Sequence, residues 1–127
     1  MRLLLDTRVF LWSVKNDRKL SKAIQSRILR ATEVYVSSAS IWELVIKIKL
    51  KKLDANIDRL LEPISESEFV ELPITARHAA YVRYLPNIHH DPFDRILVAR
   101  AICEPLTLLT ADVALKDYSE LVELINF

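Results

Sequence analysis

The chain has 127 residues, of which 51% are hydrophobic and 28% are charged, and it contains no glycine. Its 18 basic and 17 acidic residues leave a net charge of +1, which excludes the overall positive field of many nucleic-acid-binding proteins. The absence of glycine excludes the standard P-loop, dinucleotide fingerprint and nucleophile elbow, because each needs glycine where the backbone approaches a phosphate or turns sharply. We therefore expect the chemistry to come from side chains.

The length and the apolar fraction fit a single domain over residues 1–127. The one cysteine, Cys103, excludes an internal disulfide and favours a cytoplasmic location. No apolar run approaches the roughly 20 residues of a membrane span, so we expect no association with a membrane.

The first half of the chain alternates predicted strands and helices. The apolar run at residues 3–5 predicts a short strand buried on both faces, and a helix is expected from about 8 to 14. Apolar residues at helical spacing begin after Ser21, and the β-branched and aromatic residues 34–36 predict a second strand. The apolar face of the next helix starts at Ile41. This helix leads into a basic stretch that contains Lys47, Lys49, Lys51 and Lys52.

The second half continues the alternation and contains the clearest helix. In Asp91-Pro92, an Asp N-cap precedes Pro at the first helical position, and the apolar residues 96–102 continue this helix. The other expected elements are, in order, a helix at 57–67, a strand at 69–72, a helix at 75–84 and strands at 106–109 and 122–125. Strands that alternate with helices predict an α/β fold with a central, mostly parallel sheet covered by helices on both faces.

Four acidic residues fall where such a sheet places its ligands, which is beyond the carboxyl ends of the strands. Asp6 and Asp112 follow predicted strands, and Glu43 lies on the first turns of the helix after the second strand. Asp94 lies one turn into the helix that begins at Asp91-Pro92, and this turn points to the same edge if the helix packs on the sheet. We hypothesise that the four carboxylates converge.

Helix capping is the alternative explanation for each residue, because acidic side chains are favoured in first turns. In that interpretation Asp6 caps the following helix and Asp112 caps a short turn. Glu43 closes a capping box with Ser40, and Asp94 does the same with Asp91 at the start of its helix. If the carboxylates do converge, they repel one another unless a cation neutralises them. All-oxygen ligands favour Mg²⁺ or Mn²⁺, and the natural reaction is metal-assisted hydrolysis of a phosphodiester.

Histidines and further basic residues show weaker patterns. The adjacent His89 and His90 lack the i, i+4 spacing of a zinc site, so contact with a phosphate or a surface position is expected, and His78 is assigned to a helix surface. Local positive charge for a polyanionic substrate is available from the lysines at 47–52 with Arg95 and Arg100. A solvated helix face is the alternative for these cations.

Two tryptophans and three asparagines are assigned structural positions. Trp12 and Trp42 are flanked by apolar residues, which favours the core or an interface over a base-stacking role. Asn16, Asn56 and Asn87 stand where helix ends otherwise use glycine.

Four segments form an ordered series along the chain: Leu3-Leu4-Leu5-Asp6-Thr7, Ser37-Ser38-Ala39-Ser40-Ile41-Trp42-Glu43-Leu44, His90-Asp91-Pro92-Phe93-Asp94-Arg95-Ile96-Leu97-Val98-Ala99 and Leu108-Leu109-Thr110-Ala111-Asp112. In this order they resemble the successive motifs of the PIN-domain family, and more narrowly those of VapC-type toxins from bacterial toxin–antitoxin pairs. The series spans residues 3–112, and the four segments together are more specific for this family than any one of them alone.

The resemblance implies an endoribonuclease that depends on Mg²⁺ or Mn²⁺, hydrolyses RNA phosphodiester bonds and acts as the toxin of a type II toxin–antitoxin system. By matching position, the catalytic and metal-binding residues are Asp6, Glu43, Asp94 and Asp112. Thr7 and Thr110 supply nearby hydroxyls, and Asp91 fits better as an N-cap than as a ligand. The resemblance also implies a homodimer and a VapB-like antitoxin whose C-terminal tail covers the acidic site.

The chain departs from the family pattern in its loops. Arg8 stands where relatives often have His, and Lys51-Lys52 and Glu104-Pro105 replace turns that commonly carry glycine. Two other enzyme and signalling classes are excluded: a haloacid dehalogenase-type phosphatase needs a second Asp where Arg8 stands, and a receiver domain needs adjacent acidic residues after its first strand. The alternative that the sequence leaves open is a catalytically inactive PIN-like module that binds RNA or a protein partner.

Overall fold

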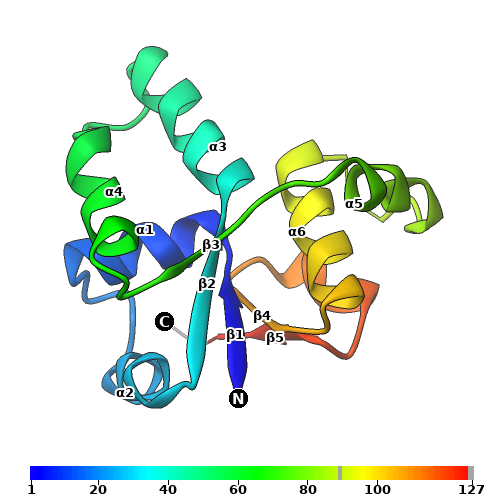
Figure 1. The fold of residues 1–127 in the computed structure, drawn as a ribbon, viewed down its shortest axis with the longest axis horizontal. Coiled ribbons are helices and arrows are strands. Elements are labelled where there is room, and N and C mark those ends of the chain that lie inside the picture. Colours follow the sequence, from blue (N-terminus) through cyan, green and yellow to red (C-terminus); the bar gives the residue numbers. More distant parts are fainter. Residues whose placement is uncertain (89, 126–127) are drawn as a thin grey trace.

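The computed structural model describes residues 1–88 and 90–125, in which strands and helices alternate along most of the chain (Figure 1). In chain order the main elements are β1 (Arg2–Leu5), α1 (Thr7–Lys15), α2 (Lys22–Arg30), β2 (Glu33–Ser37), α3 (Ser38–Lys49), α4 (Ile57–Ser65), β3 (Val70–Leu72), α5 (Ala76–Tyr81), α6 (Pro92–Cys103), β4 (Thr107–Thr110) and β5 (Val122–Leu124). Two short 3₁₀ helices are η1 (Val82–Tyr84) and η2 (Val113–Tyr118).

The five strands of the described residues form one sheet in the order β3-β2-β1-β4-β5, and each pairing in it is parallel. Leu4 of β1 pairs with Tyr35 on one side and with Leu108 on the other, so β1 is the central strand. The chain moves outward from β1 to β2 and β3, and then crosses back to add β4 and β5 on the other side. The strand order therefore reverses between β1 and β4, which is where open parallel sheets bind ligands.

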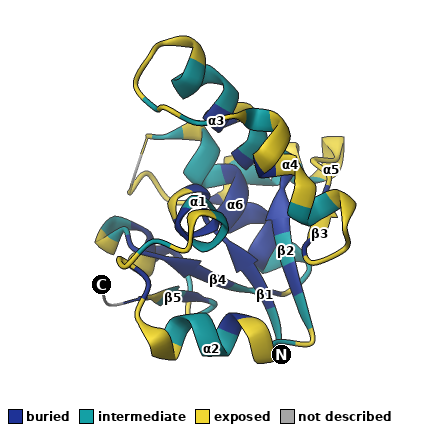
Figure 2. Cartoon of the chain, turned by 90° about the vertical axis from the view of Figure 1, so that its left-hand side faces the viewer, coloured by how far each residue is buried: buried dark blue, intermediate teal, exposed yellow. Residues whose placement is uncertain are grey.

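Helices cover both faces of the sheet because its central strand is apolar on both sides. Leu3 and Leu5 belong to one hydrophobic core, with side chains from α1, α2 and α4, whereas Leu4 belongs to a second core that contains much of α6. Figure 1 shows α1, α2 and α4 on one side of the sheet and α5 and α6 on the other. Figure 2 shows that the strands are mostly buried, while the outer sides of α2 and α4 are exposed.

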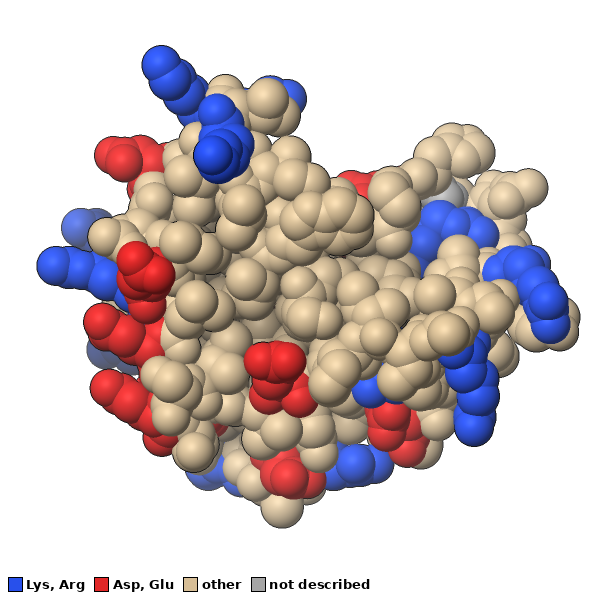
Figure 3. Space-filling model, turned by 45° about the horizontal axis from the view of Figure 1, so that its top comes forward, with Lys and Arg blue, Asp and Glu red and all other residues tan. Residues whose placement is uncertain are grey.

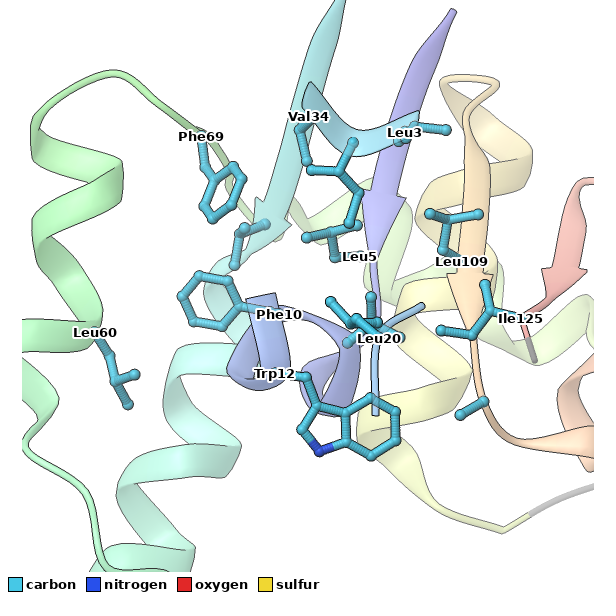
Figure 4. Close-up of a cluster of buried hydrophobic side chains, with 14 of the residues drawn as sticks. Leu3, Leu5, Phe10, Trp12, Leu20, Val34, Leu60, Phe69, Leu109 and Ile125 are labelled. Carbon is cyan, nitrogen blue, oxygen red and sulfur yellow. The ribbon is translucent and has the colours of Figure 1, made fainter. Parts of the chain in front are cut away.

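The first core connects the sheet to α1 and to the segment before β3. In Figure 4, Leu3, Leu5 and Val34 extend from the strands toward the cluster that contains Phe10. The rings of Phe10 and Phe69 meet edge to face, with centroids 5.8 Å apart. This packing fixes α1 directly after β1 and so determines where the residues between them lie.

The structure confirms the predicted α/β fold with a parallel sheet between two helical layers. The helix expected at 75–84 ends as α5 at Tyr81 and continues as η1. The sequence did not predict η2, in which Leu115 and Tyr118 are the buried residues and repeat at the three-residue spacing of a 3₁₀ helix. Within residues 1–88 and 90–125, no helix is long and apolar enough to cross a membrane.

Left-handed backbone, which usually favours glycine, is adopted by three residues in the described part of the chain: Asn16, Lys51 and Ser67. The prediction for Asn16 is confirmed, because it ends α1 with φ 54°. The prediction for Asn56 was wrong: it begins α4, and its side chain accepts from the backbone N–H groups of Asp58 and Arg59. Asn87 does not adopt left-handed backbone, so the prediction that it takes the place of a glycine there was also wrong.

Candidate active site

The buried polar side chains gather at the carboxyl edge of the sheet. Of the seven buried polar or charged residues in the described part of the chain, six lie at or just after the ends of β1, β2 and β4. These six are Asp6, Thr7, Ser37, Ser40, Glu43 and Thr110. None of these six has a buried side-chain oxygen without a hydrogen-bond partner, so they form a satisfied polar network at this edge.

Asp6 lies at the end of the central strand and is the N-cap of α1. Its Oδ1 accepts from the backbone N–H of Val9 at 2.8 Å, and its Oδ2 accepts from the Thr110 hydroxyl at 2.6 Å. Burial raises the pKa of the Asp6 carboxyl above its ordinary value of 3.8, and these two hydrogen bonds offset only part of that effect. The residue therefore caps a helix, as the alternative explanation predicted, and also presents a desolvated carboxyl group at the end of the central strand.

Asp112 is connected to Asp6 through Thr110. The Thr110 hydroxyl, which donates to Asp6, also accepts from the backbone N–H of Asp112 at 3.0 Å. The Asp112 side chain is the N-cap of η2, since its Oδ1 accepts from the backbone N–H of Ala114 at 3.0 Å. Capping uses only part of the acceptor capacity of a carboxylate, which has about four lone-pair positions. Capping and ligand binding are thus compatible at both Asp6 and Asp112.

Glu43 lies in the second turn of α3, and two side chains hold its carboxylate. The Thr7 hydroxyl donates to Glu43 Oε1 at 2.6 Å and lies 3.0 Å from the Ser40 hydroxyl. Lys47, one turn further along α3, places its Nζ 3.2 Å from Glu43 Oε2. The N-cap of α3 is Ser37, so the predicted capping box between Ser40 and Glu43 is not formed. Glu43 is instead a buried acceptor held by Thr7 and Lys47.

Asp94 lies in the first turn of α6 and is half-buried. The helix begins as predicted: Asp91 is its N-cap, and Asp91 Oδ1 accepts from the backbone N–H of Phe93 at 2.9 Å and of Asp94 at 3.4 Å. Phe93 packs edge to face on Trp42 of α3 with ring centroids 5.3 Å apart, which holds the start of α6 beside α3. This contact places the first turn of α6, which carries Asp94, next to α3.

The predicted convergence of the four carboxylates is incomplete. Hydrogen bonds join Asp6 to Asp112 through Thr110, but within the described residues no three His, Cys, Asp or Glu side chains lie close enough to hold a metal ion. The donors are nevertheless carboxylate and hydroxyl oxygens, which suit Mg²⁺ or Mn²⁺, and burial raises the pKa of the Asp6 carboxyl. The residues fit such an ion by their chemistry.

Two arginines predicted to supply positive charge have structural positions instead. Arg100 is buried, with 4% of its surface exposed, and its Nη1 lies 2.8 Å from Glu104 Oε1. Arg95 donates to the backbone carbonyls of Pro86 and Val82 and to the Tyr118 hydroxyl. Both side chains therefore secure α6 to neighbouring segments, whereas the charge of Arg8 acts on Asp6 and Lys47 of α3 pairs with Glu43.

The histidine and tryptophan predictions have mixed outcomes. His78, assigned to a helix surface, is half-buried with its ring against Arg100, while His89 lies outside the described residues and His90 is exposed. Trp12 is in the core as predicted, with 7% exposed. Trp42 is 61% exposed, so it is not in the core, and its predicted alternative position at an interface stays a prediction.

Sequence reasoning missed the roles of Ser40 and Lys47 beside Glu43. Lys47 was recognised as part of a basic stretch, but not as the partner of a buried carboxylate. The signal was available, because Glu43 and Lys47 have the i, i+4 spacing of a helical ion pair. No comparable pattern marks Ser40, whose contact with Thr7 crosses from α3 to α1.

Fold and site together define a parallel α/β protein with acidic residues around the point where the strand order reverses. The model of the PIN-domain family matches residues 3–121, and the chain belongs to this family. No curated protein matches the chain by sequence.

Solved structures agree with this assignment of the fold. The chain is similar to VapBC2 from Rickettsia felis bound to a DNA fragment from its promoter, with TM-score 0.69, 18% identity and 96% of each chain covered. It is also similar to FitAcB from Neisseria gonorrhoeae, with TM-score 0.64, 20% identity and coverage of 98% of this chain and 96% of that chain. A structure of FitAB bound to the IR36 DNA fragment has TM-score 0.57, 18% identity and 90% of each chain covered.

Proposed function

We propose that this protein is a divalent-metal-dependent endoribonuclease that acts as the toxin of a type II toxin–antitoxin system. The observation that carries the proposal is the buried Asp6 carboxylate, held by Thr110 and Val9 where the strand order reverses. Desolvation of this carboxylate is relieved by a divalent cation, and the expected ligands are Asp6, Glu43, Asp94 and Asp112. Membership of the PIN-domain family supports hydrolysis of a nucleic acid as the reaction.

In this proposal the ion, the carboxylates that bind it and the hydroxyls that hold those carboxylates have separate tasks. Bound Mg²⁺ or Mn²⁺ supplies an activated water and neutralises the charge that develops on the phosphate. Asp6 and Asp112, which follow β1 and β4, and Glu43 and Asp94, on α3 and α6, would hold the ion. Thr110 and Thr7 orient Asp6 and Glu43 through hydrogen bonds of 2.6 Å each. Such outer partners typically change metal affinity or activity by about 10–100-fold.

The partners in this proposal are a VapB-like antitoxin and a second copy of the chain. The VapC-type order of the four sequence segments supports this, as does the similarity to VapBC2 bound to promoter DNA and to FitAB bound to IR36 DNA. The antitoxin's C-terminal tail covers the acidic site, and the toxin is a homodimer in the cytoplasm. Because the site lies at an open edge of the sheet, a tail that covers it blocks access of RNA.

Cleavage of RNA by the purified protein tests the enzymatic part. We expect cleavage with Mg²⁺ or Mn²⁺ and none in EDTA. Asp6→Asn and Asp94→Asn should each lower cleavage by roughly 100-fold or more, because they remove a ligand rather than an outer partner. Asp117→Asn makes the same charge change at an exposed position of η2 and serves as the control. Undiminished cleavage in EDTA, or full activity in either variant, contradicts the mechanism and favours the inactive binding module.

Growth of the expressing cells tests the toxin part. We expect expression of the chain to stop growth and expression of the Asp94→Asn variant to be tolerated. A small protein encoded next to this gene should restore growth when it is co-expressed, and should co-purify with the chain. Growth arrest that persists equally in the Asp94→Asn variant contradicts a nuclease toxin.

A further inference from the structure

A groove runs between the second half of α3 and the turn that begins α6. Its volume is about 400 Å³, and its lining includes Glu43, Lys47 and Lys52 on one side and Asp91 and Phe93 on the other. Glu43 is also part of the candidate active site, so the groove leads directly into that site. A chain that enters the active site past Glu43 can therefore continue along this groove.

The end of α3 brings the two groove lysines together. After Leu50, Lys51 adopts left-handed backbone with φ 59°, and its N–H donates to the carbonyl of Ile48 at 3.0 Å. The N–H of Lys52 donates to the carbonyl of Lys47 at 2.9 Å. These two bonds form a Schellman motif, which turns the chain back over the last turn of the helix. Lys52 thus lies beside Lys47 although the two are five positions apart in sequence.

Positive charge dominates the exposed part of the groove. Glu43 is only 8% exposed and accepts from Thr7, and Asp91 uses its Oδ1 to cap α6. The Lys47 side chain is 41% exposed although its Nζ reaches Glu43, and Lys52 is exposed. Figure 3 shows basic side chains gathered over the outer end of α3, beside a largely uncharged face. The groove therefore offers two adjacent cations at its outer end and carboxylates at the end that meets the active site.

We propose that this groove binds the sugar–phosphate backbone of single-stranded RNA next to the bond that is cut, with Lys47 and Lys52 on neighbouring phosphates. The inference rests on the proposed ribonuclease function and assigns the path of its substrate. Trp42, 61% exposed and packed on Phe93, supplies an aromatic ring beside the groove on which a base can stack. An exposed ring of this kind favours nucleic acid over an acidic peptide, which has no base to stack.

The salt dependence of RNA binding tests this assignment without relying on catalysis. Binding of a fluorescent oligouridylate of about ten nucleotides is measured in EDTA at several salt concentrations, so that the RNA stays intact. Each lysine–phosphate contact on a single strand contributes about 0.7 to the slope of log affinity against log salt concentration. We expect Lys47→Gln and Lys52→Gln each to weaken binding and to reduce the slope by about 0.7. Lys52→Gln is the cleaner variant, because only Lys47 pairs with Glu43.

Lys49→Gln is the matched control, because Lys49 is an exposed lysine of the same helix that does not line the groove. It should leave the slope unchanged. If the wild-type protein cuts RNA but the Lys47 and Lys52 variants match Lys49→Gln, the groove assignment is overturned while the ribonuclease stands. If polyglutamate displaces the RNA as well as unlabelled oligouridylate does, the groove is a peptide site and the assignment is also overturned. A wild-type protein that neither binds nor cuts RNA refutes both proposals.

Discussion

The two halves of the candidate site differ in how firmly their carboxylates are held. On the strand side, Asp6 is buried and accepts from the backbone N–H of Val9 and from the Thr110 hydroxyl, which in turn accepts from the backbone N–H of Asp112. On the helix side, Glu43 has one strong partner in Thr7 and one in the half-exposed Lys47, and it borders an open groove. The Asp6 carboxylate is thus held by α1 and β4 within the packed sheet edge, whereas the Glu43 carboxylate borders an open groove.

The largest effect should come from weakening the strand side. Thr110→Val removes the 2.6 Å hydrogen bond to Asp6 Oδ2 and should lower cleavage by about 10–100-fold. Because that bond lowers the pKa of Asp6, its loss raises this pKa further, and the acid limb of the pH–activity profile should move to higher pH. Thr107→Val, an equivalent change at the start of β4, is the control. An unmoved acid limb in Thr110→Val would show that Asp6 does not control the reaction.

A smaller effect is expected on the helix side. Thr7→Val removes the 2.6 Å hydrogen bond to Glu43 Oε1, but Lys47 still holds Oε2. We expect cleavage to fall by about 10-fold, the lower end of the range for outer partners. The double variant Thr7→Val/Lys47→Gln should lose more than the two single effects combined, because Glu43 then loses both partners. Strictly additive losses would show that Thr7 and Lys47 do not act on the same carboxylate.

The pH dependence of the free energy of unfolding should distinguish the buried Asp6 carboxylate from the exposed carboxylates. Burial raises the pKa of Asp6 in the folded protein above 3.8, so the folded state binds more protons and wild-type stability falls as pH rises from 3.8 through the raised pKa. Asp6→Asn does not titrate and should therefore be more stable than wild type at neutral pH in EDTA. This advantage should disappear as the pH falls to 3.8. Denaturant unfolding at a series of pH values measures the difference, and an advantage that is constant with pH contradicts the assigned cause.

The smallest effect concerns the turn that positions the groove lysines. Left-handed backbone costs a residue with a Cβ atom about 1 kcal/mol, so Lys51→Gly should raise the free energy of unfolding by about that amount. Lys51→Ala keeps the Cβ atom and should leave stability nearly unchanged. Urea unfolding compares the two variants. Equal stability of the Gly and Ala variants would contradict the strained Schellman turn.

The sequence predicted the strand side of the site well, for a physical reason. Continuous apolar runs at residues 3–5 and 106–109 indicate strands buried on both faces, and parallel strands bring their carboxyl ends to one edge. Asp6 follows the first run directly and Asp112 comes three residues after the second, so their placement near the sheet edge needed only local patterns. The link through Thr110 depends on the pairing of β1 with β4, about a hundred residues apart, and no local pattern encodes it.

The helix side was harder to predict because adjacent residues on a helix point in different directions. Trp42 stands between Ile41 and Glu43, and neighbouring residues point to different sides of a helix, so Trp42 is exposed while Leu44 is buried. Arg100 was expected at the surface, but residues 96–101 of α6 are all buried, so its charge is neutralised internally by Glu104. Such outcomes depend on what packs around each helix, which the sequence pattern alone does not state.

Direct binding of Mn²⁺, measured by titration calorimetry on the RNA-free protein, tests the central claim that Asp6 anchors a divalent cation. We expect wild-type protein and the Asp117→Asn control to bind Mn²⁺, and Asp6→Asn, folded as judged by circular dichroism, to lose most of that affinity. Binding of Mn²⁺ by Asp6→Asn with the same affinity as wild type would contradict the account.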